Sequence, residues 1–347
     1  MAELRRFGDF ATFKYGKMPD KKKLTESGKY PVYSGYRYVG YYDEYNTEAN
    51  QIIVVARGVG GTGDVKLTKE RCYLTNLSIS ADIDENIALP EFIYYYYLPH
   101  NLRYLDSGSA QSQITISDLE KVMIPLPSLG EQRAICGYMK MLDRKIEINE
   151  AVNENLAQQA QAIYTDMFIT NADPTWTMGH LSDLITVKYG KDHKKLDGGP
   201  YPVYGSGGIM RYVERPLYDK ESVLIPRKGT LNNVLYVNEP FWSVDTMFFT
   251  EMKRPNVAKY VYHFVKSKDL ASLNAGSAVP SMTTDILNAM ELLIPDTDSL
   301  SRFESIVAPM FLTMQQNTQE SGKLAETRDI LLPRLMTGEL DVSELSL

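Results

Sequence analysis

Residues 130–168 read GEQRAICGYMKMLDRKIEINEAVNENLAQQAQAIYTDMF. This stretch holds no proline and only two glycines, and it is rich in residues that favour the α-helix. Its apolar positions alternate in steps of four and three, which is the 3.5-residue period of coiled-coil packing. This seam consists of Ile135, Met139, Leu142, Ile146, Asn149, Asn153, Leu156, Ala160, Ile163 and Met167.

A helix of this length would span about 58 Å, so it needs a partner along its length. A second, less regular seam runs through Phe303, Ile306, Met310, Thr313, Asn317, Glu320, Leu324, Thr327 and Leu331. We therefore predict that the two helices pack as an antiparallel coiled coil. The expected packing residues are Ile135, Met139, Leu142, Ile146, Leu156, Ile163, Phe303, Ile306, Met310, Leu324 and Leu331. The polar centre, formed by Asn149, Asn153, Asn317 and Glu320, is expected to fix the helix register at some cost in stability.

Four stretches occur twice, in the same order and displaced by 168 to 174 positions. KYGK stands at 14–17 and 188–191, and a YPVY turn at 30–35 and 201–206. QIIVVARG (51–58) matches SVLIPRKG (222–229), and GSAQSQITISDLEKVMIPLP (108–127) matches GSAVPSMTTDILNAMELLIP (276–295). Collinear matches of this kind indicate a tandem duplication with units of roughly 1–170 and 171–347.

Each unit begins with short runs rich in Val, Ile and Tyr, separated by turn residues, which predict a β-rich domain. QIIVVA and ESVLIP read as buried strands, SDLEKV as a short helix before a strand, and FIYYYYLPH as either a helix or a strand. We predict an α+β fold with pseudo-twofold symmetry and a β-rich domain at each end of a helical rod. The expected segments are domain 1 (1–128), a central helix (129–170), a linker (171–180), domain 2 (181–297) and a C-terminal helix with its tail (298–347).

The formal net charge of −7 argues mildly against nucleic acid, but the charge is unevenly distributed. Residues 1–40 hold nine basic and four acidic groups (+5), and residues 181–230 hold nine basic and six acidic groups (+3). Local positive fields of this kind are compatible with a polyanionic partner. There is no apolar run of 18 residues and no secretory signal, and the two cysteines, Cys72 and Cys136, are expected to be buried thiols of a reduced, cytosolic protein.

Motifs of common enzymes are missing. No Gly-Lys precedes Ser or Thr, so there is no P-loop, and no Pro-Pro occurs, so the Asp/Asn-Pro-Pro-aromatic motif of amino-methyltransferases is absent. The four histidines show no metal-ligand spacing. RGVGGTG (57–63) fits G-x-G-x-x-G, but a β-like segment follows it, which favours a glycine-rich hairpin over a dinucleotide site.

The chain resembles the specificity subunits of type I restriction-modification systems. The resemblance is carried by GSAQSQITISDLEKVMIPLPSLGEQRAI (108–135), LLPRLMTGELDVSEL (331–345) and the two long helices, and it covers essentially the whole chain. It departs from this pattern in the second unit, where Ser301 and Arg302 replace Glu131 and Gln132 and no glutamine matches Gln113. This departure predicts weaker helix packing in the second half.

The resemblance implies a non-catalytic subunit that reads an asymmetric, two-part DNA target with a fixed gap. Its partners would be double-stranded DNA, two methyltransferase subunits and two restriction/translocase subunits. The chain would bind no cofactor itself, and S-adenosylmethionine, Mg²⁺ and ATP would be used by the partners. Two alternatives stay open: a coiled-coil adaptor whose two heads bind proteins, and an enzyme such as a nuclease with an unrecognised active site.

Reading of bases requires polar or basic side chains at base edges, with further basic groups on phosphates. In the first unit the candidates are Lys14, Lys17, Tyr33, Ser34, Tyr36, Arg37, Arg57, Ser109, Gln111 and Gln113. In the second unit they are Lys188, Lys191, Tyr204, Ser206, Arg211, Arg227, Lys228, Asn232, Asn233, Ser277 and Ser281. For Arg57 and Arg227, DNA contact and structural ion pairing are equally good interpretations.

Overall fold

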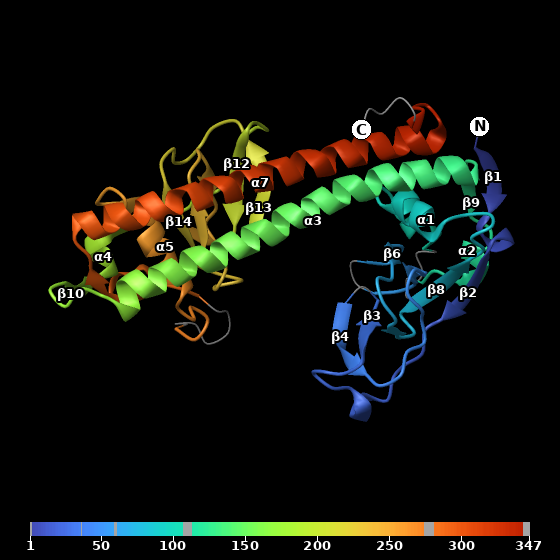
Figure 1. Cartoon of the computed structure of the whole chain (residues 1–347), viewed down its shortest axis with the longest axis horizontal. Coiled ribbons are helices and arrows are strands. Elements are labelled where there is room, and N and C mark those ends of the chain that lie inside the picture. Colours follow the sequence, from blue (N-terminus) through green and yellow to red (C-terminus); the bar gives the residue numbers. More distant parts are fainter. Residues whose placement is uncertain (1, 36, 59–60, 107–112, 274–280, 343–347) are drawn as a thin grey trace. The chain divides into compact units, whose positions relative to one another are not determined.

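The computed structural model describes residues 2–35, 37–58, 61–106, 113–273 and 281–342 (Figure 1). The chain divides into two compact units. Unit 1 comprises Met1–Glu150 and Thr318–Leu347, and unit 2 comprises Ala151–Asn317. These bounds differ from a simple division after residue 170, because each of the two long helices contributes one segment to each unit.

Unit 1 contains a four-stranded sheet in the order β2-β8-β5-β6, a three-stranded sheet in the order β4-β3-β7, and the pair β1-β9. The strands are β1 (Glu3–Arg6), β2 (Ala11–Tyr15), β3 (Tyr30–Ser34), β4 (Arg37–Tyr42), β5 (Ile52–Val55), β6 (Val65–Leu67), β7 (Tyr73–Leu74), β8 (Ser78–Ile83) and β9 (Met123–Leu126). The short helices are α1 (Pro90–Tyr97) and α2 (Ile116–Leu119).

Unit 2 repeats this topology strand for strand, with sheets β11-β17-β14-β15 and β13-β12-β16 and the pair β10-β18. The strands are β10 (Thr177–His180), β11 (Ile185–Tyr189), β12 (Tyr201–Gly205), β13 (Gly208–Val213), β14 (Ser222–Pro226), β15 (Leu235–Val237), β16 (Trp242–Ser243), β17 (Met247–Met252) and β18 (Glu291–Ile294). The short helices are α4 (Leu181–Leu184), α5 (Ala258–Lys266) and α6 (Thr284–Asn288). The identical strand order confirms the tandem duplication.

The YPVY turn marks an irregular β-hairpin in both units. β3 pairs antiparallel with β4 and parallel with β7, and its register shifts between Val32 and Tyr33. β12 pairs in the same two ways, and its register shifts between Val203 and Tyr204. A β-bulge re-aims the side chains that follow it. The motif thus encodes the same bulge twice.

The glycine of each KYGK motif is required by a close approach of two backbones. A β-carbon on Gly16 would lie 2.2 Å from the Thr75 carbonyl oxygen, and one on Gly190 would lie 2.0 Å from the Val244 carbonyl oxygen. Both distances are far below van der Waals contact. The repeated glycine is therefore explained by packing, independently of any contact with a ligand.

The two long helices are α3 (Leu129–Thr165), which continues as a π-helical turn over Asp166–Thr170, and α7 (Thr297–Thr337). α3 begins at a capping box, in which the Ser128 hydroxyl accepts from the Glu131 backbone N–H and the Glu131 carboxylate accepts from the Ser128 N–H. Before α7, the Asp296 carboxylate accepts from the Ser299 N–H at 2.8 Å, and this bond and others lower the pKa of Asp296 to about 2.

Polar side chains join α3 and α7 where the seam was predicted to turn polar. In unit 1, Asn149 donates to the Glu320 carboxylate at 2.8 Å and to the Ser321 hydroxyl at 3.2 Å. In unit 2, Asn317 donates to the Asn153 side-chain carbonyl at 2.9 Å. The repeat offset of 168 maps Asn149 onto Asn317 and Asn153 onto Ser321, so the two contacts are equivalent. Bonds of this kind hold only in one register, which is the role predicted for this segment.

The apolar faces of the long helices are wider than the predicted seam. Among the expected packing residues, Ile135, Met139 and Phe303 are buried. Leu142, Ile146, Leu156, Ile163, Met310, Leu324 and Leu331 are half-buried. Ile306 is 38% exposed, and the neighbouring Val307 is buried instead. The prediction for Ile306 was wrong because this part of α7 also packs on the core of unit 2, which shifts its buried face away from a strict coiled-coil seam.

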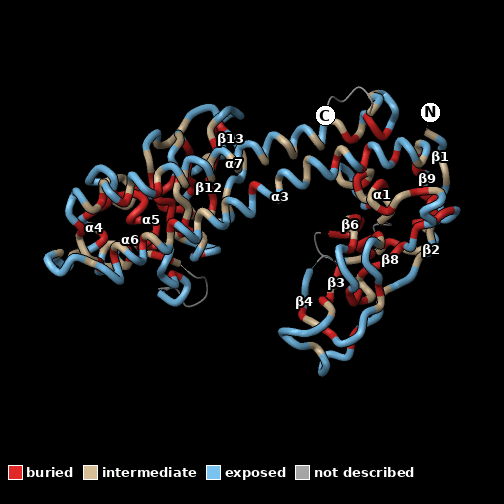
Figure 2. The backbone as a smooth tube through the Cα atoms, viewed as in Figure 1, coloured by how far each residue is buried: buried red, intermediate tan, exposed pale blue. Residues whose placement is uncertain are grey.

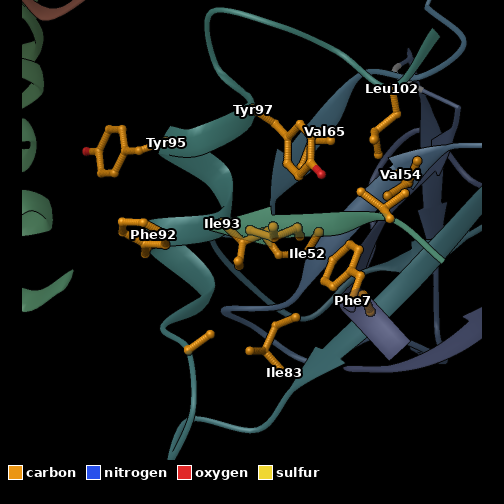
Figure 3. Packing of buried hydrophobic residues seen from close by; sticks show 14 of the residues in the cluster. Phe7, Ile52, Val54, Val65, Ile83, Phe92, Ile93, Tyr95, Tyr97 and Leu102 are labelled. Atoms are coloured by element: carbon orange, nitrogen blue, oxygen red, sulfur yellow. The ribbon is translucent and has the colours of Figure 1, made fainter. Parts of the chain in front are cut away.

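Each unit has its own hydrophobic core beneath the sheets, as the buried residues in Figure 2 show. In unit 1 the sheet residues Ile52 and Val54 pack with Phe92 and Ile93 of α1 (Figure 3). Apolar residues cover both faces of α1, and this is why its sequence was equally compatible with a strand. Cys72 and Cys136 are buried free thiols, and burial raises the pKa of each to about 12.

Two sequence-based assignments are refined. The linker predicted at 171–180 includes β10, which pairs with β18 and so belongs to unit 2. The glycine-rich segment follows β5 and leads through a turn into β6, as expected of a hairpin, while residues 59–60 lie outside the described part. No helix in the described ranges is long and apolar enough to cross a membrane.

A buried histidine makes the stability of unit 2 dependent on pH. His263 of α5 is 2% exposed, and its Nδ1 lies 2.9 Å from the Gln161 side-chain carbonyl. Burial lowers the pKa of His263 from 6.5 to about 4, with a smaller effect from Lys266. Because the folded state favours the neutral ring, this stabilisation is fully present above pH 6.5 and is lost as the pH falls toward 4.

We expect unit 2 to lose about 2 kcal/mol of stability between pH 7.5 and pH 5 through this group. The free energy of unfolding of the native chain and of His263→Gln, followed by denaturant titration at a series of pH values, tests this. The variant should show a shallower fall over the same range, because glutamine does not titrate. Equal slopes for the two proteins would assign the pH dependence to other groups.

Candidate nucleic-acid interface

The four repeated segments meet at one place in unit 1. The Lys17 N–H donates to the Leu74 carbonyl at 2.9 Å, and the Thr75 N–H donates to the Tyr33 carbonyl at 3.0 Å. The KYGK segment and the YPVY turn, called the tyrosine turn below, are thus both hydrogen-bonded to the end of β7 and the turn that follows it. The stretch after the GSA loop joins them, because the Ile114 N–H donates to the Ala56 carbonyl at 2.9 Å. Ala56 precedes Arg57-Gly58, which we call the basic-glycine step and which corresponds to Arg227-Lys228-Gly229 in unit 2.

Unit 2 repeats this arrangement bond for bond. The Lys191 N–H donates to Ser243, the Val244 N–H to Tyr204, and the Met282 N–H to Arg227, at 2.8, 3.1 and 2.9 Å. A β-carbon on Gly229 would lie 2.6 Å from the Ser206 hydroxyl, so the basic-glycine step and the tyrosine turn are in contact. Segments that are 10 to 90 residues apart in sequence therefore form one surface in each unit.

Most candidates of unit 1 are accessible on this surface. Lys14, Lys17 and Arg37 are exposed, and Tyr33, Ser34, Arg57 and Gln113 are half-buried. The Arg57 Nε is buried without a hydrogen-bond partner among the described residues. Tyr36, Ser109 and Gln111 lie outside the described residues, as does Ser277 of unit 2. The role of each as a DNA contact stays a prediction.

In unit 2 the arginine of the basic-glycine step, Arg227, contacts neighbouring residues of the same surface. Arg227 lies over the Tyr189 ring with its guanidinium carbon 5.4 Å from the ring centre, and its Nη1 donates to the Asp245 carbonyl at 3.2 Å. Lys228 is exposed and forms a β-bridge with the half-buried Ser281. Lys191 is also exposed, and Lys188 lies 3.5 Å from the Glu251 carboxylate. Neither Arg57 nor Arg227 forms an ion pair within the described ranges.

Tyr204, which was predicted to contact DNA, is buried in the structure. It is 9% exposed, packs with Phe241 in a small core, and its hydroxyl donates to the Glu239 carboxylate at 3.3 Å. Burial is also the main cause that raises the pKa of Tyr204. The ring is directed inward because the bulge after Val203 turns the following side chain toward the core. Tyr204 therefore supports the turn and is not part of the accessible surface.

Three polar candidates of unit 2 hold loops. Arg211 donates through Nη2 to the Leu196 carbonyl at 2.8 Å. Asn233 donates to the Ser206 carbonyl at 2.9 Å, which fixes the end of the tyrosine turn. Asn232 donates to the Asp269 carboxylate and accepts from the Ala271 N–H, both at 3.1 Å, and its amide lowers the pKa of Asp269. These bonds shape the surface that the other candidates present.

The sequence analysis missed the exposed apolar side chains on the hairpin strand that follows each tyrosine turn, where adjacent residues on both sides of the strand lie in solvent. On β4, Tyr38 and Val39 are 50% and 45% exposed. On β13, Ile209, Met210 and Tyr212 are 49%, 61% and 52% exposed. Single exposed apolar side chains are common on monomers, whereas groups of them are typical of interaction surfaces. The available signal was the run of apolar residues without the polar alternation of a half-buried strand.

The described residues contain no group of three His, Cys, Asp or Glu side chains that could hold a metal ion. The arrangement instead offers basic, hydroxyl and amide groups with exposed tyrosines. Such groups can bind phosphates, donate to base edges and pack against bases. The chemistry of the surface is that of recognition.

Comparison with known proteins agrees with this. Residues 2–158 and 174–303 match the family model described as the type I restriction modification DNA specificity domain. The MjaIX specificity subunit of Methanocaldococcus jannaschii is 22% identical, over 78% of this chain and 74% of that protein. The HindI specificity subunit of Haemophilus influenzae is 21% identical, over 74% and 78%.

A similar fold is found in a solved structure. The crystal structure of a type I restriction-modification S subunit from Mycoplasma genitalium superposes with a TM-score of 0.68 and 22% identity, and the match covers 96% of this chain and 95% of that one. The family match extends over both units and most of α3. The chain therefore belongs to the family of type I restriction-modification specificity subunits.

Proposed function

We propose that this chain is the DNA-specificity subunit of a type I restriction-modification complex, and that each unit reads one half of an asymmetric, two-part target. The observation that carries the proposal is the duplicated surface. The same four segments form it in both units with equivalent backbone bonds, while its side chains differ: at the repeat offset of 171, Ser34 and Arg37 of the first turn stand where the second turn has Gly205 and Gly208. A shared framework with different polar groups suits two heads that read different bases.

Catalysis belongs to the partners in this proposal. Two methyltransferase subunits would bind along α3 and α7, and two restriction/translocase subunits would join outside them. S-adenosylmethionine, Mg²⁺ and ATP would be consumed by those subunits, with no cofactor held by this chain. The family match and the recognition chemistry of the two surfaces support this division of labour.

A methylation assay tests this division. The purified chain mixed with S-adenosylmethionine and DNA is expected to transfer no methyl groups, and addition of methyltransferase subunits is expected to produce methylation at defined sites. Methyl transfer by this chain alone would contradict the proposal. Assembled complexes that bind DNA without sequence preference would instead favour a protein-binding adaptor.

Helix length should determine the gap between the half-sites. We expect an insertion of seven helix-forming residues after Glu150, with a second after Asn317, to keep the seam in phase, because seven residues are one period of the seam. Each insertion lengthens its helix by about 10 Å, which corresponds to a gap longer by about 3 base pairs. Mapping of methylated bases should show the same two half-sites at the longer spacing.

A length-preserving change is the control for this experiment. Val152 is 40% exposed on α3, and Val152→Ala is expected to leave the gap unchanged. Changed bases with an unchanged gap in the insertion variant would show that the helices do not set the spacing.

A further inference from the structure

Unit 1 contains a basic groove that lies outside the repeated surface. The groove has a volume of about 980 Å³ and lies between β6, α1 and α3. Six basic and three acidic side chains line it, a net charge of +3 in a chain whose formal charge is −7. The basic residues are Lys66, Lys69, Lys140, Arg144, Lys145 and Arg328.

Three of these basic side chains form close ion pairs within the protein. Arg328 donates to Asp143 at 2.8 Å, and the Tyr95 hydroxyl donates to the other oxygen of the same carboxylate at 2.7 Å. Figure 3 shows Tyr95 directed away from the Ile52 and Val54 side chains, toward the helix ribbon at the edge of the view. The other two are Lys140, which pairs with Glu91, and Lys145, which pairs with Glu320 beside the groove, at 2.8 and 3.0 Å. Counting Glu320 reduces the local charge to +2.

The other three cations are available to a ligand. Lys66 has no ion-pair partner in the described ranges. Lys69 and Arg144 share one carboxylate, Glu147, at 3.5 and 3.7 Å, and their side chains are 89% and 72% exposed. Exposed pairs with such geometry contribute little, so a strong anion would displace them easily. The available groups come from two elements, β6 with its following loop and α3, on facing sides of the groove.

At the equivalent described positions of unit 2, the basic side chains of this groove are replaced by uncharged ones. Lys66 lies opposite Ile53 of β5 in the sheet. In unit 2, Leu224 is equivalent to Ile53, and the residue opposite it is Leu235 in place of a lysine. On the long helices the repeat offset of 168 replaces Lys140, Arg144 and Lys145 by Ala308, Leu312 and Thr313. Aromatic rings pack together in the corresponding place, with the Tyr236 and Phe311 centres 4.8 Å apart and those of Tyr262 and Phe311 5.6 Å apart.

This difference between the units favours DNA over a methyltransferase subunit as the ligand of the groove. Two copies of one methyltransferase subunit would use equivalent surfaces on the duplicated scaffold, and a surface present in one unit alone does not fit that use. An asymmetric DNA target differs between its halves. Arg57 of the repeated surface lies two residues past the end of β5 and four residues beyond Ile53, the partner of Lys66, a separation of at most about 13 Å. A duplex held at the surface of unit 1 would need only a few base pairs to reach this groove.

We propose that this groove binds the phosphate backbone of DNA adjoining the half-site read by unit 1, through Lys66, Lys69 and Arg144. The inference rests on the proposed function. These contacts raise affinity and fix the orientation of the duplex without reading bases, because phosphates carry no direct sequence information. They make unit 1 the half that depends more strongly on salt.

Salt-dependent DNA binding by the assembled methyltransferase complex tests this proposal. The triple variant Lys66→Ala, Lys69→Ala, Arg144→Ala is compared with Lys121→Ala, Lys220→Ala, Arg254→Ala, which removes the same charge from exposed positions outside the groove and the two long helices. We expect the groove variant to lower the magnitude of the slope of log affinity against log salt by up to about 3 and to weaken binding about tenfold or more. Duplexes with and without the target should be affected alike, and the methylated sequence should not change.

The outcomes separate the possible failures. Replacement of Lys66 and Lys69 by arginine should retain the native slope, and thermal unfolding of each variant shows whether it folds. An unchanged slope in a folded triple variant overturns the proposal, and loss of a subunit from the complex together with an unchanged slope assigns the groove to a protein partner. If the native complex shows no preference for any sequence, the proposed function fails rather than this inference alone.

Discussion

Replacement of Gly190 by alanine is expected to destabilise unit 2 by about 3 kcal/mol. The new β-carbon would lie 2.0 Å from the Val244 carbonyl oxygen and 2.5 Å from that of Ser243. Both neighbours are backbone atoms, so no side-chain rotation can relieve the contact. The strand must move away, which weakens the bonds from Gly190 N–H to Met247 and from Lys191 N–H to Ser243, at 3.1 and 2.8 Å. Chemical denaturation monitored by tryptophan fluorescence measures the effect, since Trp176 and Trp242 both belong to unit 2.

Gly198→Ala is the matched control for this change. A β-carbon at Gly198 would meet nothing within 4 Å, so this variant should stay within about 0.5 kcal/mol of the native chain. Because the tyrosine turn also rests on the segment that would be displaced, Gly190→Ala should reduce DNA recognition by unit 2 as well. Native stability in Gly190→Ala would show that the KYGK glycine is retained for another reason.

Lys259→Met is expected to cost unit 2 about 3–5 kcal/mol, the largest effect of any single change proposed here. Lys259 is 4% exposed on α5, and its ammonium lies 2.7 Å from Glu304 of α7 and 3.2 Å from Glu221. It also lies 4.8 Å from the centre of the Tyr236 ring. Removal of the cation leaves two carboxylates in a largely buried site without their counter-ion. Hydrogen exchange across α5 and the adjoining segment of α7 should report the loosening directly.

Two further variants show whether charge is the cause. Lys266→Met alters the same helix at an exposed position and should have little effect. The double variant Lys259→Met, Glu304→Gln should recover part of the loss, because it removes one of the unpaired charges. A double variant less stable than Lys259→Met alone would indicate that packing of the lysine stem, rather than charge pairing, holds α5 on α7.

The long helices and the duplication were predictable because local rules determine them. The 3.5-residue period of the apolar positions predicted α3 without any knowledge of tertiary contacts. The four repeated segments form equivalent strands and turns in the two units. β10 was missed because Thr177–His180 has no strand pattern of its own, and it is a strand only through pairing with β18, more than 100 residues later. Ile306 was misplaced because the core of unit 2 determines which face of α7 is buried.

The site was predictable as a set of segments but not residue by residue. The repeat located the tyrosine turns and basic-glycine steps, and these do meet in each unit. Whether a polar side chain is accessible depends on its tertiary partners. Sequence could not show that Tyr204 is buried or that Arg211 donates to the Leu196 carbonyl. The Gln132 side chain is a further case, because it is fully buried and bonds to Leu89, Ile87 and Pro127, so it serves the packing of α3.

The second unit has no residues that match Glu131 and Gln132, and it makes other contacts at the start of α7. At the repeat offset of 168, Ser299 stands at the position of the capping-box Glu131, and its N–H donates to the Asp296 carboxylate at 2.8 Å. The nearby Ser301 hydroxyl accepts from the Asn256 amide at 3.2 Å. The ion pairs of Lys259 then supply the link between α5 and α7. The weaker packing expected of the second half stays a prediction, and the buried ion pairs make this junction sensitive to single substitutions because loss of one partner leaves an unpaired charge.

The central claim is that two different heads read two half-sites at a fixed distance. Genome-wide mapping of methylated bases in cells that carry the assembled complex tests it most directly. The account predicts one two-part motif with unlike halves separated by a constant number of unspecified base pairs. A single continuous palindrome would contradict it.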